Sequence, residues 1–152
     1  MGARILGIVA SIVLVGCQHD PFTEVYTTKQ PKAEDLVGLY VPSEETKAFI
    51  ANEGHYSPAE SSITLSADGS VSMTNIPDWW LTPFGESQGG FHSYHGRWTV
   101  QKHQDWWVVG VSLEDATGTE VFLIGEKVPY KIHIILGDPD GGRGMDFVRS
   151  KT

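Results

Sequence analysis

The sequence has only one cysteine among its 152 residues, Cys17. It therefore cannot form a disulfide within the chain, and a folded domain has to be held together by its apolar core. Hydrophobic residues make up 40% of the sequence, which is enough for a core in a chain of this length. The position of the single thiol, directly after an apolar stretch, indicates a different role for it.

The apolar residues near the N-terminus are too few to span a membrane. The run over residues 5–15 covers about 11 positions, whereas a spanning helix needs about 20. Arg4 precedes this run and the small residue Gly16 follows it, an order typical of a secretory signal peptide. The sequence therefore predicts a signal peptide over residues 1–16.

The end of this segment, Leu14-Val15-Gly16-Cys17, resembles the lipobox of bacterial lipoproteins. The resemblance implies cleavage before Cys17, attachment of a diacylglycerol to its sulfur and acylation of its new amino group. Acyl chains contribute about 0.8 kcal/mol per buried methylene, so two or three chains would hold the protein on a bilayer. The alternative is an ordinary signal peptide followed by a buried cysteine. The resemblance also assigns Gln18 a sorting role: because it is not aspartate, we expect the outer membrane, with the protein facing the periplasm.

Basic residues are scarce, since 11 Lys and Arg stand against 19 Asp and Glu, which gives a formal charge of −8. Without residues 1–16, which contain Arg4, the charge is 10 minus 19, or −9. An acidic surface argues against binding to nucleic acid and against electrostatic docking on anionic lipid. It is compatible with solubility alone or with a basic protein partner.

Motifs of common catalytic and metal sites are also missing. The sequence contains no Gly-x-Ser-x-Gly, no phosphate-binding loop and no His-Glu-x-x-His. His92 and His95 lie three positions apart in a segment that reads as a strand, where this spacing gives opposite faces. We therefore expect a non-catalytic protein without a cofactor or a bound metal. The remaining histidines considered as ligands are scattered: His55, His103 and His133.

Three aspartates, Asp138, Asp140 and Asp146, lie close together near the C-terminus and suggest a calcium loop. They lack the ligand spacing and the terminal glutamate of an EF-hand. Pro139 followed by Gly141-Gly142 is typical of a turn between two strands, and we predict a turn here.

Residues 17–34, which begin with the predicted lipidated cysteine, show neither helical nor strand periodicity and carry Pro21 and Pro31. We interpret them as a flexible tether to a domain over residues 35–150. The domain is expected to open with a strand over residues 35–41.

A short helix should follow that first strand. Ser43 suits its N-cap, Glu44 and Glu45 suit its first turn, and Gly54 can terminate it, so we predict a helix over residues 44–52. The rest of the domain alternates between apolar and polar residues in short segments separated by turn residues. This pattern predicts a mainly β fold, an antiparallel up-and-down barrel, with a β-sandwich as the alternative. The expected strands lie in residues 61–76 as a hairpin, 91–103, 105–114, 119–136 as two strands and 145–149.

The stretch Asp35-Leu36-Val37-Gly38-Leu39-Tyr40 is similar to the Gly-x-Trp signature that opens lipocalin-like barrels, with tyrosine in place of tryptophan. Gly96-Arg97-Trp98 matches the tripeptide itself but lies in mid-chain. The resemblance favours a lipocalin-like barrel, and it raises the possibility of a cavity for a small apolar ligand.

The segment 76–91 combines aromatic residues with prolines and glycines. We predict that it forms a loop whose Trp79, Trp80, Phe84 and Phe91 contact a ligand or partner. The alternative is that one tryptophan closes the core and the other stands at its edge.

Taken together, these features predict a non-catalytic lipoprotein of the bacterial cell envelope that binds or scaffolds in the periplasm. One alternative is a carrier of a small apolar ligand in a lipocalin-like cavity. Another is an inhibitor or immunity-type protein that uses its negative surface against a basic periplasmic enzyme.

Overall fold

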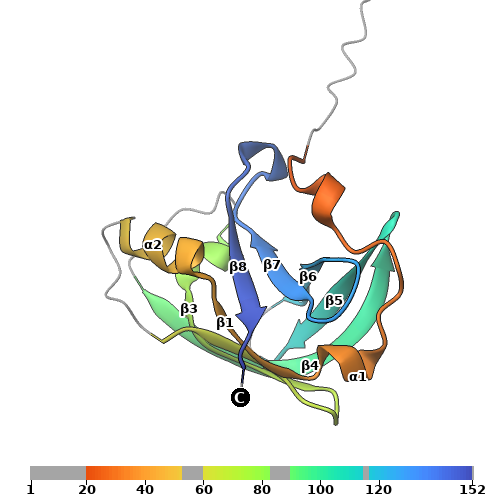
Figure 1. The fold of residues 1–152 in the computed structure, drawn as a ribbon. Helices are drawn as coiled ribbons and strands as arrows, with labels where there is room; N and C mark the ends of the chain where they lie inside the picture. Colours follow the sequence, from red (N-terminus) through yellow and green to blue (C-terminus); the bar gives the residue numbers. More distant parts are fainter. Residues whose placement is uncertain (1–19, 53–59, 83–89, 115–116, 152) are drawn as a thin grey trace, which may run out of the picture.

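The computed structural model describes residues 20–52, 60–82, 90–114 and 117–151. Eight strands of the described chain form a closed antiparallel barrel, in which each strand pairs with the next and β8 pairs with β1 (Figure 1). The predicted up-and-down barrel is thus confirmed, and the sandwich alternative is wrong. The strands are β1 (Gly38–Pro42), β2 (Ser62–Leu65), β3 (Ser70–Pro77), β4 (Phe91–His103), β5 (Trp106–Leu113), β6 (Thr119–Ile124), β7 (Lys131–Ile135) and β8 (Gly144–Arg149).

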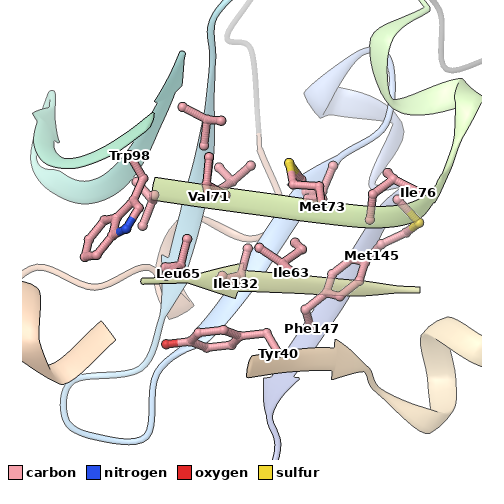
Figure 2. Close-up of a cluster of buried hydrophobic side chains, with 14 of the residues drawn as sticks. Tyr40, Ile63, Leu65, Val71, Met73, Ile76, Trp98, Ile132, Met145 and Phe147 are labelled. Atoms are coloured by element: carbon pink, nitrogen blue, oxygen red, sulfur yellow. The ribbon is translucent and has the colours of Figure 1, made fainter. Parts of the chain in front are cut away.

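The inside of the barrel is filled by large apolar side chains, to which all eight strands contribute. Figure 2 shows part of this core, with labelled side chains from β1, β2, β3, β4, β7 and β8. The β2–β3 hairpin shows how the sequence specifies this core. Ile63 pairs with Met73 and Leu65 with Val71, so the two strands send matching apolar residues inward. The expected shared face of Tyr130, Ile132, Ile134 and Leu136 is also buried in this core, as predicted.

The helix α2 (Glu44–Asn52) has the predicted bounds and the predicted N-cap. The hydroxyl of Ser43 accepts a hydrogen bond from the backbone N–H of Thr46 at 3.1 Å, which satisfies a free donor of the first turn. Ile50 faces the core from the other end of the helix. The proposed terminator Gly54 and the histidine His55 lie outside the described residues.

The predicted first strand starts later than expected. A single helical turn, α1 (Ala33–Leu36), precedes it, and the strand begins only at Gly38. Leu36 is fully buried in the core, and its carbonyl accepts a hydrogen bond from the hydroxyl of Tyr40 at 2.9 Å. The burial of Leu36 in the core, together with this local hydrogen bond, orders a segment whose residues alone read as extended.

Residues 20–27, here called the strap, lie on the outside of the barrel and include the 3-10 turn η1 (Thr23–Val25). The backbone N–H of Thr27 donates to Leu123 of β6, while its carbonyl accepts from Trp107 of β5, at 2.9 and 2.8 Å. Tyr26 is only 2% exposed. Part of the segment 17–34, which the sequence predicts to be a flexible tether, thus makes hydrogen bonds with two strands of the barrel.

The barrel has two distinct ends, named here after the helix at each. The α2 end carries the β1–β2, β3–β4, β5–β6 and β7–β8 connections, including the 3-10 turns η2 (Asp78–Leu81) and η3 (Pro139–Gly141). The α1 end carries α1 and the other three turns. Figure 1 shows the strap beginning beside η3 at the α2 end, while the C-terminus leaves at the α1 end.

Candidate functional site

Four polar side chains meet on the outer face of β7 and β8, beneath the strap, and form what we call the His133 cluster. His133 and Asp146 are facing partners in the two strands, with Nδ1 and Oδ1 2.6 Å apart. The ammonium of Lys131 lies 3.8 Å from the other carboxylate oxygen. Thr46 of α2 completes the cluster, since its hydroxyl accepts a hydrogen bond from the backbone N–H of Asp146 at 2.8 Å.

The alternation of both strands places this cluster outside the barrel. Ile132 and Ile134 point into the core, so the period of two sends His133 outward. On β8, Met145 and Phe147 also point into the core, so Asp146 between them points outward. Sequence reasoning treated the histidine as isolated and the aspartate as part of a turn cluster. A hairpin whose midpoint lies between Pro139 and Asp140 would have placed them opposite each other.

The strap covers the cluster with an aromatic ring. The rings of Phe22 and His133 lie 4.3 Å apart between centroids, and His133 is only 2% exposed. Nε2 of His133 is buried and has no hydrogen-bond partner among the described residues. A buried nitrogen without a partner is uncommon in folded proteins, so this atom marks the point where the cluster is least satisfied.

A groove of about 370 Å³ borders the cluster. Ser43, Glu45, Lys131 and Arg143 line it, so it presents hydroxyl groups and charges of both signs. The pKa of Glu45 is lowered by its own backbone N–H and then by the hydroxyl of Ser43. The groove is large enough for a small polar group. The Ser43 hydroxyl, however, is already engaged, because it caps α2 and lies 3.3 Å from the hydroxyl of Thr46.

A row of aromatic rings continues from the cluster across β6 and β5. Tyr26 of the strap stacks on Phe122 at 4.6 Å and lies 5.4 Å from Trp106. His103 stacks on Trp106 at 6.4 Å between ring centroids and meets Phe122 edge-on at 5.9 Å, and its Nδ1 lies 2.6 Å from Oε2 of Glu120. A histidine–carboxylate pair therefore stands at each end of the row. Burial, followed by a hydrogen bond to the carboxylate of Asp20, raises the pKa of Tyr26.

The predicted contact residues of the 76–91 segment differ in their burial and position. Trp80 is 8% exposed and packs edge-on against Tyr94, with ring centroids 5.8 Å apart, so it belongs to the core. Phe91 is half-buried against that core. The backbone of Trp79 lies in η2, and Phe84 lies outside the described residues. The alternative in which a tryptophan closes the core therefore applies to Trp80.

Asp78 fixes the base of this same connection. Its backbone N–H donates to the carbonyl of Gly90, and its carboxylate accepts from the N–H of Gly90, both at 3.0 Å. These two hydrogen bonds hold together the two ends of the β3–β4 connection. Burial, with a smaller contribution from the nearby charge of Asp78, raises the pKa of Tyr94.

The predicted ligand-type residues do not gather. Within the described ranges, the structure holds no group of three or more His, Cys, Asp or Glu side chains that could bind a metal ion. Asp138 accepts a hydrogen bond from the backbone of Asp140 at 3.0 Å and caps η3, which agrees with the predicted turn. Asp146 lies on β8, away from that turn, and faces His133.

Comparison with known proteins found no matching family model, no matching curated protein and no matching solved structure. Among the described residues, no helix has both the length and the apolar character needed to cross a bilayer.

Proposed function

We propose that the protein is a non-catalytic lipoprotein of the bacterial cell envelope, anchored through Cys17 and facing the periplasm from the outer membrane. Its barrel acts as a binding or scaffolding module. The sequence Leu14-Val15-Gly16-Cys17, placed after an apolar run, supports the anchor. Gln18 supports the outer membrane as the site.

The packed interior is the observation that favours a binding or scaffolding role over a carrier role. An eight-stranded barrel is just wide enough for side chains to fill it, unless small residues leave a cavity. Here Tyr40, Met73, Trp98 and Phe147 are among the large side chains that occupy the inside. Binding at the outer surface fits this arrangement better than enclosure of an apolar ligand.

The His133 cluster supports a non-catalytic role. The histidine hydrogen-bonds to Asp146 and lies under Phe22, while Asp146 also holds α2 through Thr46. The cluster therefore joins the strap, α2 and the β7–β8 hairpin. General acid–base chemistry requires groups that reach a reacting atom, whereas the ring of His133 is only 2% exposed and lies under Phe22.

The anchor can be tested by expressing the full chain in a Gram-negative bacterium. We expect the wild-type protein to sediment with membranes, and globomycin to cause an unprocessed precursor to accumulate. Cys17→Ala should be recovered in the soluble fraction, whereas Val25→Ala, a change at an exposed strap residue, should stay with membranes. A Cys17→Ala protein that still sediments with membranes would contradict the proposed anchor.

The acidic surface favours a second candidate, an inhibitor or immunity-type protein that binds a basic periplasmic enzyme. After loss of residues 1–16 the formal charge is −9, from 10 basic and 19 acidic residues. Such a complex should form at low salt and dissociate as salt screens the charges. A pull-down at low salt that captures no basic protein would count against this candidate.

A further inference from the structure

We infer that the lipid on Cys17 holds the α2 end of the barrel directly against the phospholipid surface, with the α1 end turned toward the periplasm. This inference rests on the proposed lipidation and adds an orientation to it. A long flexible tether would leave the barrel free to rotate. The structure replaces that tether with a strap that is part of the fold.

The folded part of the chain begins very close to the anchor. Oδ1 of Asp20 accepts a hydrogen bond from the backbone N–H of Phe22, and Oδ2 accepts one from the hydroxyl of Tyr26, both at 2.8 Å. Tyr26 is itself buried among Phe122 and Trp106. Asp20 is therefore fixed on the barrel by contacts within the described chain.

Three peptide units separate Cys17 from Asp20. A fully extended chain spans at most about 3.6 Å per residue, so Asp20 lies within about 11 Å of Cys17, whatever path the chain takes between them. The acyl chains of a lipidated Cys17 lie in the bilayer, which keeps this residue at the headgroup layer. Asp20 must then lie at or near that layer.

The position of Asp20 on the barrel decides which end faces the lipid. The strap begins beside η3, where a Cβ added at Gly142 would lie 3.3 Å from Cγ of Pro21. This turn connects β7 to β8 and belongs to the α2 end, whereas the C-terminus leaves at the α1 end (Figure 1). Strand β8 has six residues and rises about 20 Å between the two ends.

The charge of the α2 end argues for the covalent link, and against adhesion, as the cause of this orientation. Exposed Glu44, Glu45, Asp138 and Asp140 outnumber the two cations of α2 and the β7–β8 turn, the exposed Lys47 and the partly exposed Arg143. An acidic surface is not attracted to anionic headgroups. The α2 end should therefore lie near the bilayer only when the lipid is attached.

The orientation also changes the surroundings expected for the predicted contact segment 76–91. The turn η2, which contains Trp79 and Trp80, joins β3 to β4 at the α2 end. It therefore lies on the bilayer side of the molecule. The surface that remains open to the periplasm is the α1 end.

Two single-cysteine labels on the native lipidated protein test the orientation. A thioether at Cys17 does not react with thiol probes, so Asp140→Cys in η3 and Ala67→Cys in the β2–β3 turn can each carry one fluorophore. Both positions are exposed, one at each end of the barrel. The proteins are reconstituted in phosphatidylcholine vesicles that contain a lipid with a spin-labelled headgroup, which quenches nearby fluorophores.

We expect the label at position 140 to lose most of its fluorescence and the label at position 67 to keep most of it. Insertion of about 20 flexible glycine and serine residues between Gln18 and His19 gives a tether with a reach of about 25 Å, and should remove the difference. Equal quenching without the insertion, on protein whose Cys17 is diacylated by mass spectrometry, would overturn the orientation alone. An unmodified Cys17 in the same spectrum would overturn the anchor and the orientation together.

Discussion

The ring of His133 occupies the space that a side chain at position 144 would need. A Cβ added at Gly144 would lie 2.6 Å from Nε2 of His133 and 3.1 Å from the carbonyl oxygen of Ile134. The glycine on β8 thus lets a histidine on β7 lie flat against the sheet, where Phe22 of the strap can cover it.

The substitution Gly144→Ala should therefore destabilise the protein. The added methyl group must displace the buried histidine, and overpacking of this kind costs about 1–3 kcal/mol in the free energy of unfolding. Gly141→Ala is the matched control, because an added Cβ there meets no atom within 4 Å, and it should change the free energy by less than about 0.5 kcal/mol. Urea unfolding measures both; a Gly144→Ala protein as stable as wild type would show that the ring is free to move.

Asp146→Ala should cost more stability than its ion pair with Lys131 would suggest. The change removes the acceptor of a histidine that is 2% exposed, and leaving such a donor unsatisfied costs about 1–3 kcal/mol. Lys131→Ala, which removes only a half-exposed partner 3.8 Å from the carboxylate, should cost about 0–1 kcal/mol. Equal losses in urea unfolding would contradict the assigned role of His133.

Stability should fall as the pH rises from about 10 to 12. Burial raises the pKa of Tyr40 from 10.0 to about 12, opposed only in part by Arg149. Above pH 10 the unfolded chain loses this proton while the folded protein keeps it, so the free energy of unfolding decreases with pH. Tyr40→Phe should lower stability at neutral pH, because it removes the hydrogen bond to Leu36, but should flatten the alkaline fall. Urea unfolding at several pH values measures this, and an unchanged slope in Tyr40→Phe would refute the assignment.

A filled barrel should not take up apolar ligands. We expect titration with fluorescent fatty acids to leave the intrinsic tryptophan fluorescence unchanged, because Trp98 and its neighbours already occupy the interior. Saturable quenching at one ligand per protein would restore the carrier alternative. In that event Met73→Trp, which adds bulk inside the barrel, should reduce the affinity.

The strands and the helix α2 could be predicted from the sequence because local patterns specify them. Alternation at Ile63, Leu65, Val71 and Met73 gives the hairpin, and the N-cap at Ser43 marks the helix start. The strap could not be predicted in this way. Its order depends on contacts with Trp107 of β5 and Leu123 of β6, which lie 80 and 96 positions after Thr27 in the sequence, and no periodicity within residues 20–27 reports them.

The His133 cluster was missed for a related reason. The alternation of β7 correctly sends His133 outward, which by itself suggests exposure to solvent. Its burial comes from Phe22, a residue far away in the sequence that was assigned to a flexible tether. The partner Asp146 could have been identified from the register of the β7–β8 hairpin, but only once the turn at residues 138–142 was fixed.

Mass spectrometry of the N-terminal peptide from membrane-extracted native protein decides whether the chain is anchored through Cys17. We expect a chain that starts at Cys17 and carries the added mass of a diacylglyceryl group. A mature chain that starts at another residue, or a Cys17 with a free thiol, would contradict it.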